Sequence, residues 1–245
     1  MANWSDPRSS GATFATPTGA RTEAYDAGLR SYMLSVYNYM TSGILLTGIV
    51  ALVFATSGYA AQVFLGGGIL KYIIMLAPLA FVFGMSMGQG RMSFSTLQAM
   101  FWGFAVTMGL SLSTVFLQYS GTAVAQSFFA TAAAFGGLSL YGYTTKRDLS
   151  TFGTFLIMGL VGLIVASLLN LFFQSSVMAL VISIVGVLLF AGLTAYDTQR
   201  TKSMYAYVAG TADEGRTVIM SALSLYLDFI NMFLFILRIF GSSRN

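Results

Sequence analysis

Two aspartates are the residues whose types and positions point most directly to chemistry. Asp197 and Asp228 lie inside strongly apolar stretches, at 188–198 and 223–240. An aspartate near the centre of a membrane helix costs about 2.5 to 3.5 kcal/mol on insertion scales, and such residues usually mark ion paths or proton relays. The positions of the two acids therefore predict a site that handles protons or cations.

The composition predicts that membrane helices carry these acids. Hydrophobic residues make up 56% of the chain and charged residues 8%, whereas charged residues make up about 25% of a typical soluble domain. The absence of Cys and His from the sequence removes thiolate sites, the commonest metal ligand and the usual neutral-pH switch. We expect no cofactor and no tightly bound metal. The basic residues are spread thinly between apolar runs, so we expect no nucleic-acid surface.

Seven apolar stretches have about the 20 residues needed to cross a hydrocarbon core of about 30 Å. We therefore expect an all-α membrane protein with helices at 36–56, 70–89, 95–118, 122–143, 152–173, 177–198 and 218–240. Residues 1–30 are rich in small and polar types, which predicts a disordered tail, and residues 31–245 should form one bundle. The connections are short, so consecutive helices should be antiparallel neighbours.

The basic residues predict the orientation of the bundle. All twelve Lys and Arg except Lys71, Arg238 and Arg244 fall on the side of the N-terminal tail. Because cytoplasmic connections retain Lys and Arg, we expect a cytoplasmic N terminus. The side of the C terminus stays open, since a re-entrant final segment would bring Arg238 and Arg244 to the cytoplasmic side and satisfy the rule better.

The two aspartates are equally distant from the centre of the turn expected at 210–215. Equidistant residues of an antiparallel helical hairpin lie at the same depth, so Asp197 and Asp228 can meet if both helices continue well into this connector. Two facing carboxylates in a low-dielectric site cannot both stay ionised cheaply, so the pair should share one proton and titrate as a unit. A blander interpretation is that each acid hydrogen-bonds only a neighbouring helix or loop amide.

Arg91 ends the second apolar stretch on the predicted cytoplasmic side, which is also the side nearer the acids. An ion pair between Arg91 and Asp197 would act as a latch, and protonation of the acid would release it. An equally good interpretation is a basic anchor whose side chain reaches the lipid phosphates.

Residues 195–199 read Ala-Tyr-Asp-Thr-Gln, residues 225–231 read Leu-Tyr-Leu-Asp-Phe-Ile-Asn, and residues 235–241 read Phe-Ile-Leu-Arg-Ile-Phe-Gly. These segments resemble the paired terminal motifs of the Bax inhibitor family, the transmembrane Bax-inhibitor-motif proteins, in a bacterial-type member. The resemblance implies six helices around a central C-terminal seventh, and a pH-sensitive calcium leak with Asp197 and Asp228 as its sensor. By the same resemblance, Arg91 matches an arginine of the second helix that pairs with the first motif aspartate.

Calcium transit fits this region better than calcium storage. A calcium ion takes about six to eight oxygen ligands, and two carboxylates with nearby hydroxyls and carbonyls supply too few for tight binding. We expect transient calcium contact near Asp197 and Asp228. The expected partners are therefore calcium, protons and the lipid bilayer.

Two other functions stay open. The chain could regulate a membrane protease or a survival factor by binding it, without transport. The two acids also resemble those of intramembrane aspartyl proteases, but the sequence before Asp228 lacks the Gly-x-Gly-Asp pattern of those enzymes, and we expect no enzymatic activity. The short tail without organelle-targeting features favours a bacterial inner membrane.

Overall fold

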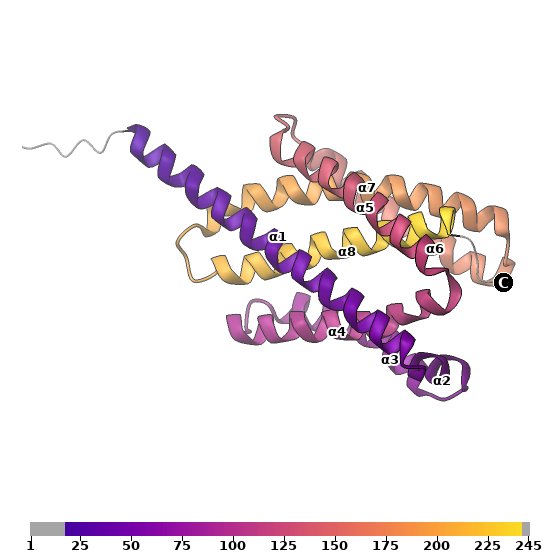
Figure 1. Ribbon diagram of the computed structural model, residues 1–245. Helices are drawn as coiled ribbons and strands as arrows, with labels where there is room; N and C mark the ends of the chain where they lie inside the picture. Colours follow the sequence, from indigo (N-terminus) through magenta and orange to yellow (C-terminus); the bar gives the residue numbers. More distant parts are fainter. Residues whose placement is uncertain (1–17, 242–245) are drawn as a thin grey trace, which may run out of the picture.

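The computed structural model describes residues 18–241, and of residues 18–22 only the backbone. Within this range the chain forms eight helices and no strand (Figure 1). The helices are α1 (Thr18–Thr56), α2 (Tyr59–Leu65), α3 (Leu70–Gly88), α4 (Phe94–Gln118), α5 (Gly121–Thr144), α6 (Ser150–Phe173), α7 (Ser176–Val208) and α8 (Glu214–Phe240). In this described part, all helices except the short α2 are long and apolar enough to cross a membrane, which gives seven spans. The all-α fold with seven spans is as the sequence predicts.

The N-terminal boundary of the bundle differs from the prediction. α1 begins at Thr18, so the prediction of a disordered segment is wrong for residues 18–30. The rest of the predicted tail, residues 1–17, lies outside the described residues.

Packing against α7 explains the early start of α1. The ring of Tyr205 lies 5.2 Å from that of Tyr25 and 5.3 Å from that of Tyr32, measured between centroids. Gly28 faces the same side chain, and a Cβ there would overlap the Tyr205 hydroxyl. Most of the stability of a protein helix comes from such tertiary packing, which the polar composition of this segment does not reveal.

α8 is the central helix (Figure 1). In its most apolar stretch 67% of the residues are buried, against 11% to 39% in the other spans. It packs directly on α1, α4, α5 and α7, while α3 packs on α4 and α6 packs on α7. The six other spans thus surround α8, four in contact with it and two in an outer layer. The outer helices expose large apolar side chains that suit a lipid surrounding, including Ile73, Leu76, Phe155 and Leu171.

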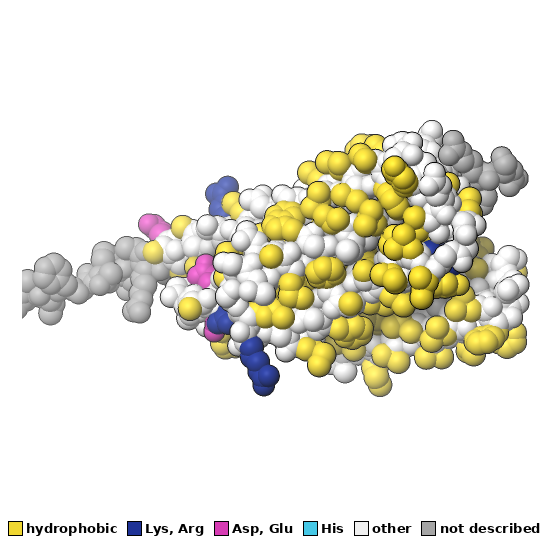
Figure 2. Space-filling view, turned by 90° about the horizontal axis from the view of Figure 1, so that it is seen from below, with side chains coloured by type: hydrophobic (Ala, Val, Ile, Leu, Met, Phe, Trp, Pro, Cys, Tyr) yellow, Lys and Arg dark blue, Asp and Glu magenta, His cyan; other side chains and the backbone are white. Residues whose placement is uncertain are grey.

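α8 is one unbroken helix, and this decides whether the final segment crosses the membrane or is re-entrant. α1 begins and α8 ends at opposite ends of the bundle (Figure 1), so the final span is not re-entrant. Figure 2 shows that most charged side chains on the visible face gather at the end where α1 begins, while hydrophobic side chains cover much of the remainder.

Candidate ion and proton site

The site is built on the antiparallel hairpin of α7 and α8. α7 continues ten residues beyond Thr198 to Val208, and α8 begins at Glu214. Both helices therefore extend into the connector, which is the condition for Asp197 and Asp228 to lie at the same depth. The turn between them closes locally: Gly210 adopts a φ of 70° and its N–H donates to Glu214 Oε2 at 2.8 Å. Arg216 forms an ion pair with Asp213 at the same turn.

The hairpin brings Asp197 and Asp228 together. The two carboxyl groups interact electrostatically with each other across the α7–α8 interface. Asp228 is only 4% exposed, and its Oδ2 has no hydrogen-bond donor among the described residues. Asp197 is partly buried, and its Oδ2 accepts a hydrogen bond of 2.8 Å from Ser224 Oγ of α8.

This arrangement favours one proton on the pair. A buried carboxylate without a donor is costly, and a second negative charge beside it adds repulsion. With one proton on the pair, one carboxyl group can donate to the other, so the two acids are expected to titrate together. Asp197 has two neighbours that Asp228 lacks, the Ser224 donor and the charge of Arg200.

The first motif, residues 195–199, packs tightly against α5 and α6. Gly142 of α5 lies so close to the Ala195 carbonyl that a Cβ would overlap it, and Gly153 of α6 lies under the Tyr196 ring in the same way. Gln199 binds the α5–α6 connector with both ends of its amide: Oε1 accepts from Leu149 N and Nε2 donates to Arg147 O, each at 2.8 Å. The motif therefore holds Asp197 in a rigid surrounding.

The second motif is anchored on the other side of α8. Tyr226 OH lies 2.6 Å from Thr47 Oγ1 of α1. The Thr47 hydroxyl donates to Ala105 O of α4 at 2.8 Å. Phe229 packs edge-on against Phe128 and Phe135 of α5. These contacts fix the rotation of α8 and so aim Asp228 at α7.

Arg91 lies in the α3–α4 connector with an exposed side chain. Among the residues that the structure describes it forms no ion pair, so the expected pair with Asp197 is not formed here. Arg216 of α8 contacts this connector, where its Nη1 donates to Met92 O at 3.3 Å. The latch role of Arg91 stays a prediction.

Sequence reasoning missed Ser224 and Arg200 as neighbours of the acids. The signal was present in the spacing. Ser224 lies four residues before Asp228, one turn away on the same helix face, and Arg200 lies three residues after Asp197.

Among the side chains that the structure describes, residues 23–241, no three His, Cys, Asp or Glu gather in a way that could hold a metal ion. Outside the spans, Asp148 accepts hydrogen bonds from the backbone N–H and hydroxyl of Ser150, and these bonds lower the pKa of its carboxyl group. Asp148 is an exposed connector residue and not part of the pair.

Comparison with known proteins shows that the chain is similar to proteins of several bacteria, one of which is named an inner membrane protein. The family model described as "Inhibitor of apoptosis-promoting Bax1" matches residues 29–245. The inner membrane protein YbhL of Escherichia coli K12 is 41% identical over 220 residues, which cover 89% of this chain and 94% of that protein. An uncharacterized protein of Rickettsia prowazekii, RP147, is 46% identical over 93% of this chain and 96% of its own length. An uncharacterized protein of Caulobacter vibrioides is 42% identical over 93% and 95%. None of these three names describes an enzyme.

Proposed function

Because the chain belongs to the Bax inhibitor family, we propose that this integral membrane protein is a pH-sensitive cation leak for calcium, regulated by Asp197 and Asp228. The observation that carries the proposal is the setting of Asp228. Its carboxyl group is buried, one oxygen has no donor among the described residues, and its electrostatic partner is a second acid, Asp197 of the preceding helix α7.

Burial and mutual repulsion make the charge of this pair depend on pH. When the pair holds a proton, it carries at most one negative charge and needs no further counter-ion. When the proton leaves, two carboxylates face each other, and a passing cation relieves their repulsion. Carboxylate and hydroxyl oxygens are the ligands that calcium prefers, and the pair with Ser224 supplies too few for lasting binding. The site therefore suits transit.

We further infer that the protein lies in a bacterial inner membrane with the start of α1 on the cytoplasmic side. The charge bias at that end of the bundle supports this orientation. The name of the Escherichia coli relative supports the location.

Calcium flux into proteoliposomes tests the proposal. The purified protein is reconstituted with a calcium dye inside, and influx is measured in steps between about pH 5 and pH 8. We expect a leak in the unchanged protein that varies with pH. In Asp197→Asn and Asp228→Asn, singly and together, this dependence should flatten, because an amide keeps the shape of the side chain and cannot titrate.

Asp148→Asn is the matched control, since it makes the same chemical change at an exposed aspartate outside the spans. Its pH profile should equal that of the unchanged protein. If all three variants of the pair kept the pH profile of the unchanged protein, the role of the acids would be refuted. No calcium flux in the unchanged protein at any pH would refute transport itself.

A further inference from the structure

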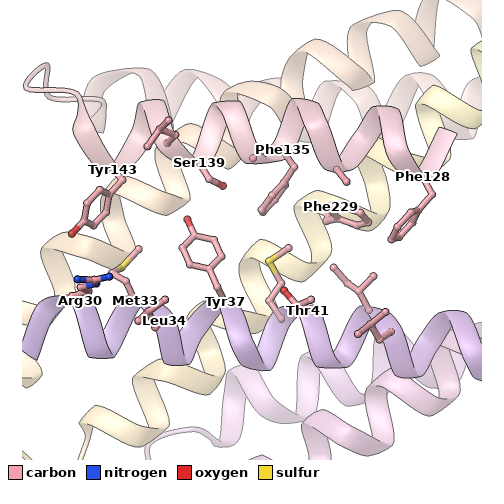
Figure 3. Close-up of a pocket in the computed structure, with 16 residues that line it drawn as sticks. Arg30, Met33, Leu34, Tyr37, Thr41, Phe128, Phe135, Ser139, Tyr143 and Phe229 are labelled. Carbon is pink, nitrogen blue, oxygen red and sulfur yellow. The ribbon is translucent and has the colours of Figure 1, made fainter. Parts of the chain in front are cut away.

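A groove of about 710 Å³ lies between α1 and α5 (Figure 3). We call it the α1–α5 groove. α1 supplies one wall and α5 the other, and Phe229 of α8 contributes to the floor. Its lining is mostly apolar and includes Met33, Leu34, Phe128, Ala132 and Phe135.

The groove stays open because α5 presents small residues to it. Ala132, Gly136 and Ser139 follow one another at intervals of three and four residues, so they lie on one helix face. A Cβ added at Gly136 would meet no atom within 4 Å, so the space in front of this glycine is unfilled. The walls are held apart because α1 and α5 each pack on α8.

The groove faces the lipid bilayer. Both of its walls are membrane-spanning helices. Three leucines that line it are 53%, 57% and 64% exposed, namely Leu34, Leu45 and Leu140. Since large apolar side chains at a span surface contact lipid tails, an occupant can enter sideways from the bilayer.

The two ends of the groove differ in polarity. Arg30 and Tyr143 lie at one end, and Phe128 and Phe229 lie toward the other (Figure 3). Arg30 is the only charged residue among the described ones that line the groove. It lies at the end of the bundle where α1 begins, which is the charged end.

The groove is long enough to hold a lipid chain. From Arg30 to Leu45 the helix rises by roughly 22 Å at 1.5 Å per residue. Half of a hydrocarbon core is about 15 Å, so an occupant anchored at Arg30 would reach the middle of the bilayer.

We propose that the α1–α5 groove binds one acyl chain of an anionic phospholipid, with the phosphate at Arg30. The apolar walls bind the chain, and Arg30 selects the headgroup charge. A free phosphate would leave the apolar length empty. The proposal concerns a lipid and does not depend on calcium transport.

Native mass spectrometry of the detergent-purified, delipidated full-length chain tests this proposal. The protein is titrated separately with phosphatidylglycerol and phosphatidylcholine, and the first bound lipid is counted. We expect one tight site that prefers phosphatidylglycerol. Arg30→Gln should reduce this preference roughly fivefold, because one basic residue contributes about 1 kcal/mol to the binding of anionic lipid.

Gly136→Phe should weaken the first binding of both lipids at least about tenfold, because the ring occupies the groove. Gly137→Phe is the matched control: Gly137 also has no atom within 4 Å of an added Cβ, lies next in the same helix, and does not line the groove. It should bind both lipids as the unchanged protein does. Equal binding by the two phenylalanine variants would overturn the proposal, and so would a preference that survives Arg30→Gln.

Photocrosslinking gives a second readout that does not depend on how a variant folds. Phosphatidylglycerol with a photoreactive group on its acyl chain is added to the unchanged protein in nanodiscs. Crosslinks should concentrate in peptides that contain residues 33–45 and 128–140. Crosslinks spread evenly over the exposed faces of α3 and α6 would identify ordinary bilayer contact and overturn the proposal.

Discussion

Ser224 joins the two acidic helices through a single hydrogen bond. Its hydroxyl group belongs to α8 and donates to Asp197 Oδ2 of α7 at 2.8 Å. A donor of this kind stabilises the ionised form of a carboxyl group more than the protonated form. Ser224 therefore influences how readily Asp197 gives up its proton, although it cannot titrate itself.

If the proposed leak is correct, Ser224→Ala should move the midpoint of its pH dependence to higher pH by about one to two units. A hydrogen bond to a charged group contributes about 1.5 to 3 kcal/mol, and 1.36 kcal/mol corresponds to one unit. The sign follows from the loss of a donor to the carboxylate, which makes the proton harder to remove. The flux assay in proteoliposomes measures this shift. Ser167→Ala is the control, because Ser167 Oγ donates only to Leu163 O of its own helix. A shift to lower pH would contradict the role given to Ser224.

At the scale of elements, close approach of α5 and α7 positions the first acidic motif. Gly142 lies against the backbone carbonyl of Ala195, two residues before Asp197. Only a residue without a Cβ permits this approach, and backbone atoms cannot rotate away as a flexible side chain can. The same helix carries Gly137, which faces open space.

The two glycines should respond to alanine with opposite signs. Gly142→Ala gains about 1 kcal/mol of helix propensity but introduces overpacking that typically costs 1 to 3 kcal/mol, so we expect a net loss of stability. Gly137→Ala should gain up to about 1 kcal/mol, because the propensity term acts alone. Thermal unfolding in detergent measures both changes. An unchanged or raised Tm in Gly142→Ala would show that α5 and α7 are not packed as described.

For the whole molecule, the charge bias along the bundle axis is the basis of the proposed orientation in the membrane. The chain contains no cysteine, so a single introduced cysteine reports its side without background. Ser203 is exposed in α7 at the charged end, and Ser57 is exposed just after α1 at the other end.

A membrane-impermeant maleimide applied to intact bacterial spheroplasts should label Ser57→Cys at once. Ser203→Cys should be labelled only after the membrane is permeabilised, because the proposed orientation puts the charged end on the cytoplasmic side. The protein without cysteine shows the background. The reverse pattern of labelling would invert the proposed orientation.

The sequence by itself determined the class of the fold and the identity of the acidic pair. Span length and hydropathy are local quantities, so the seven spans follow from composition alone, with most limits within a few residues of those observed. The equal distance of Asp197 and Asp228 from their turn is also a property of the chain, and the structure brings the two carboxyl groups together.

Only the tertiary structure decided which neighbours these elements have. α1 begins before its apolar stretch because Tyr205, far away in the sequence, packs on it. The α3–α4 connector leaves Arg91 exposed, and among the described residues Arg91 forms no ion pair with Asp197. The small residues that line the α1–α5 groove are visible in the sequence, but the groove itself is not. It exists because α1 and α5 each pack on α8 and leave the space in front of Gly136 unfilled, and a gap between helices is a property of packing that no stretch of sequence contains.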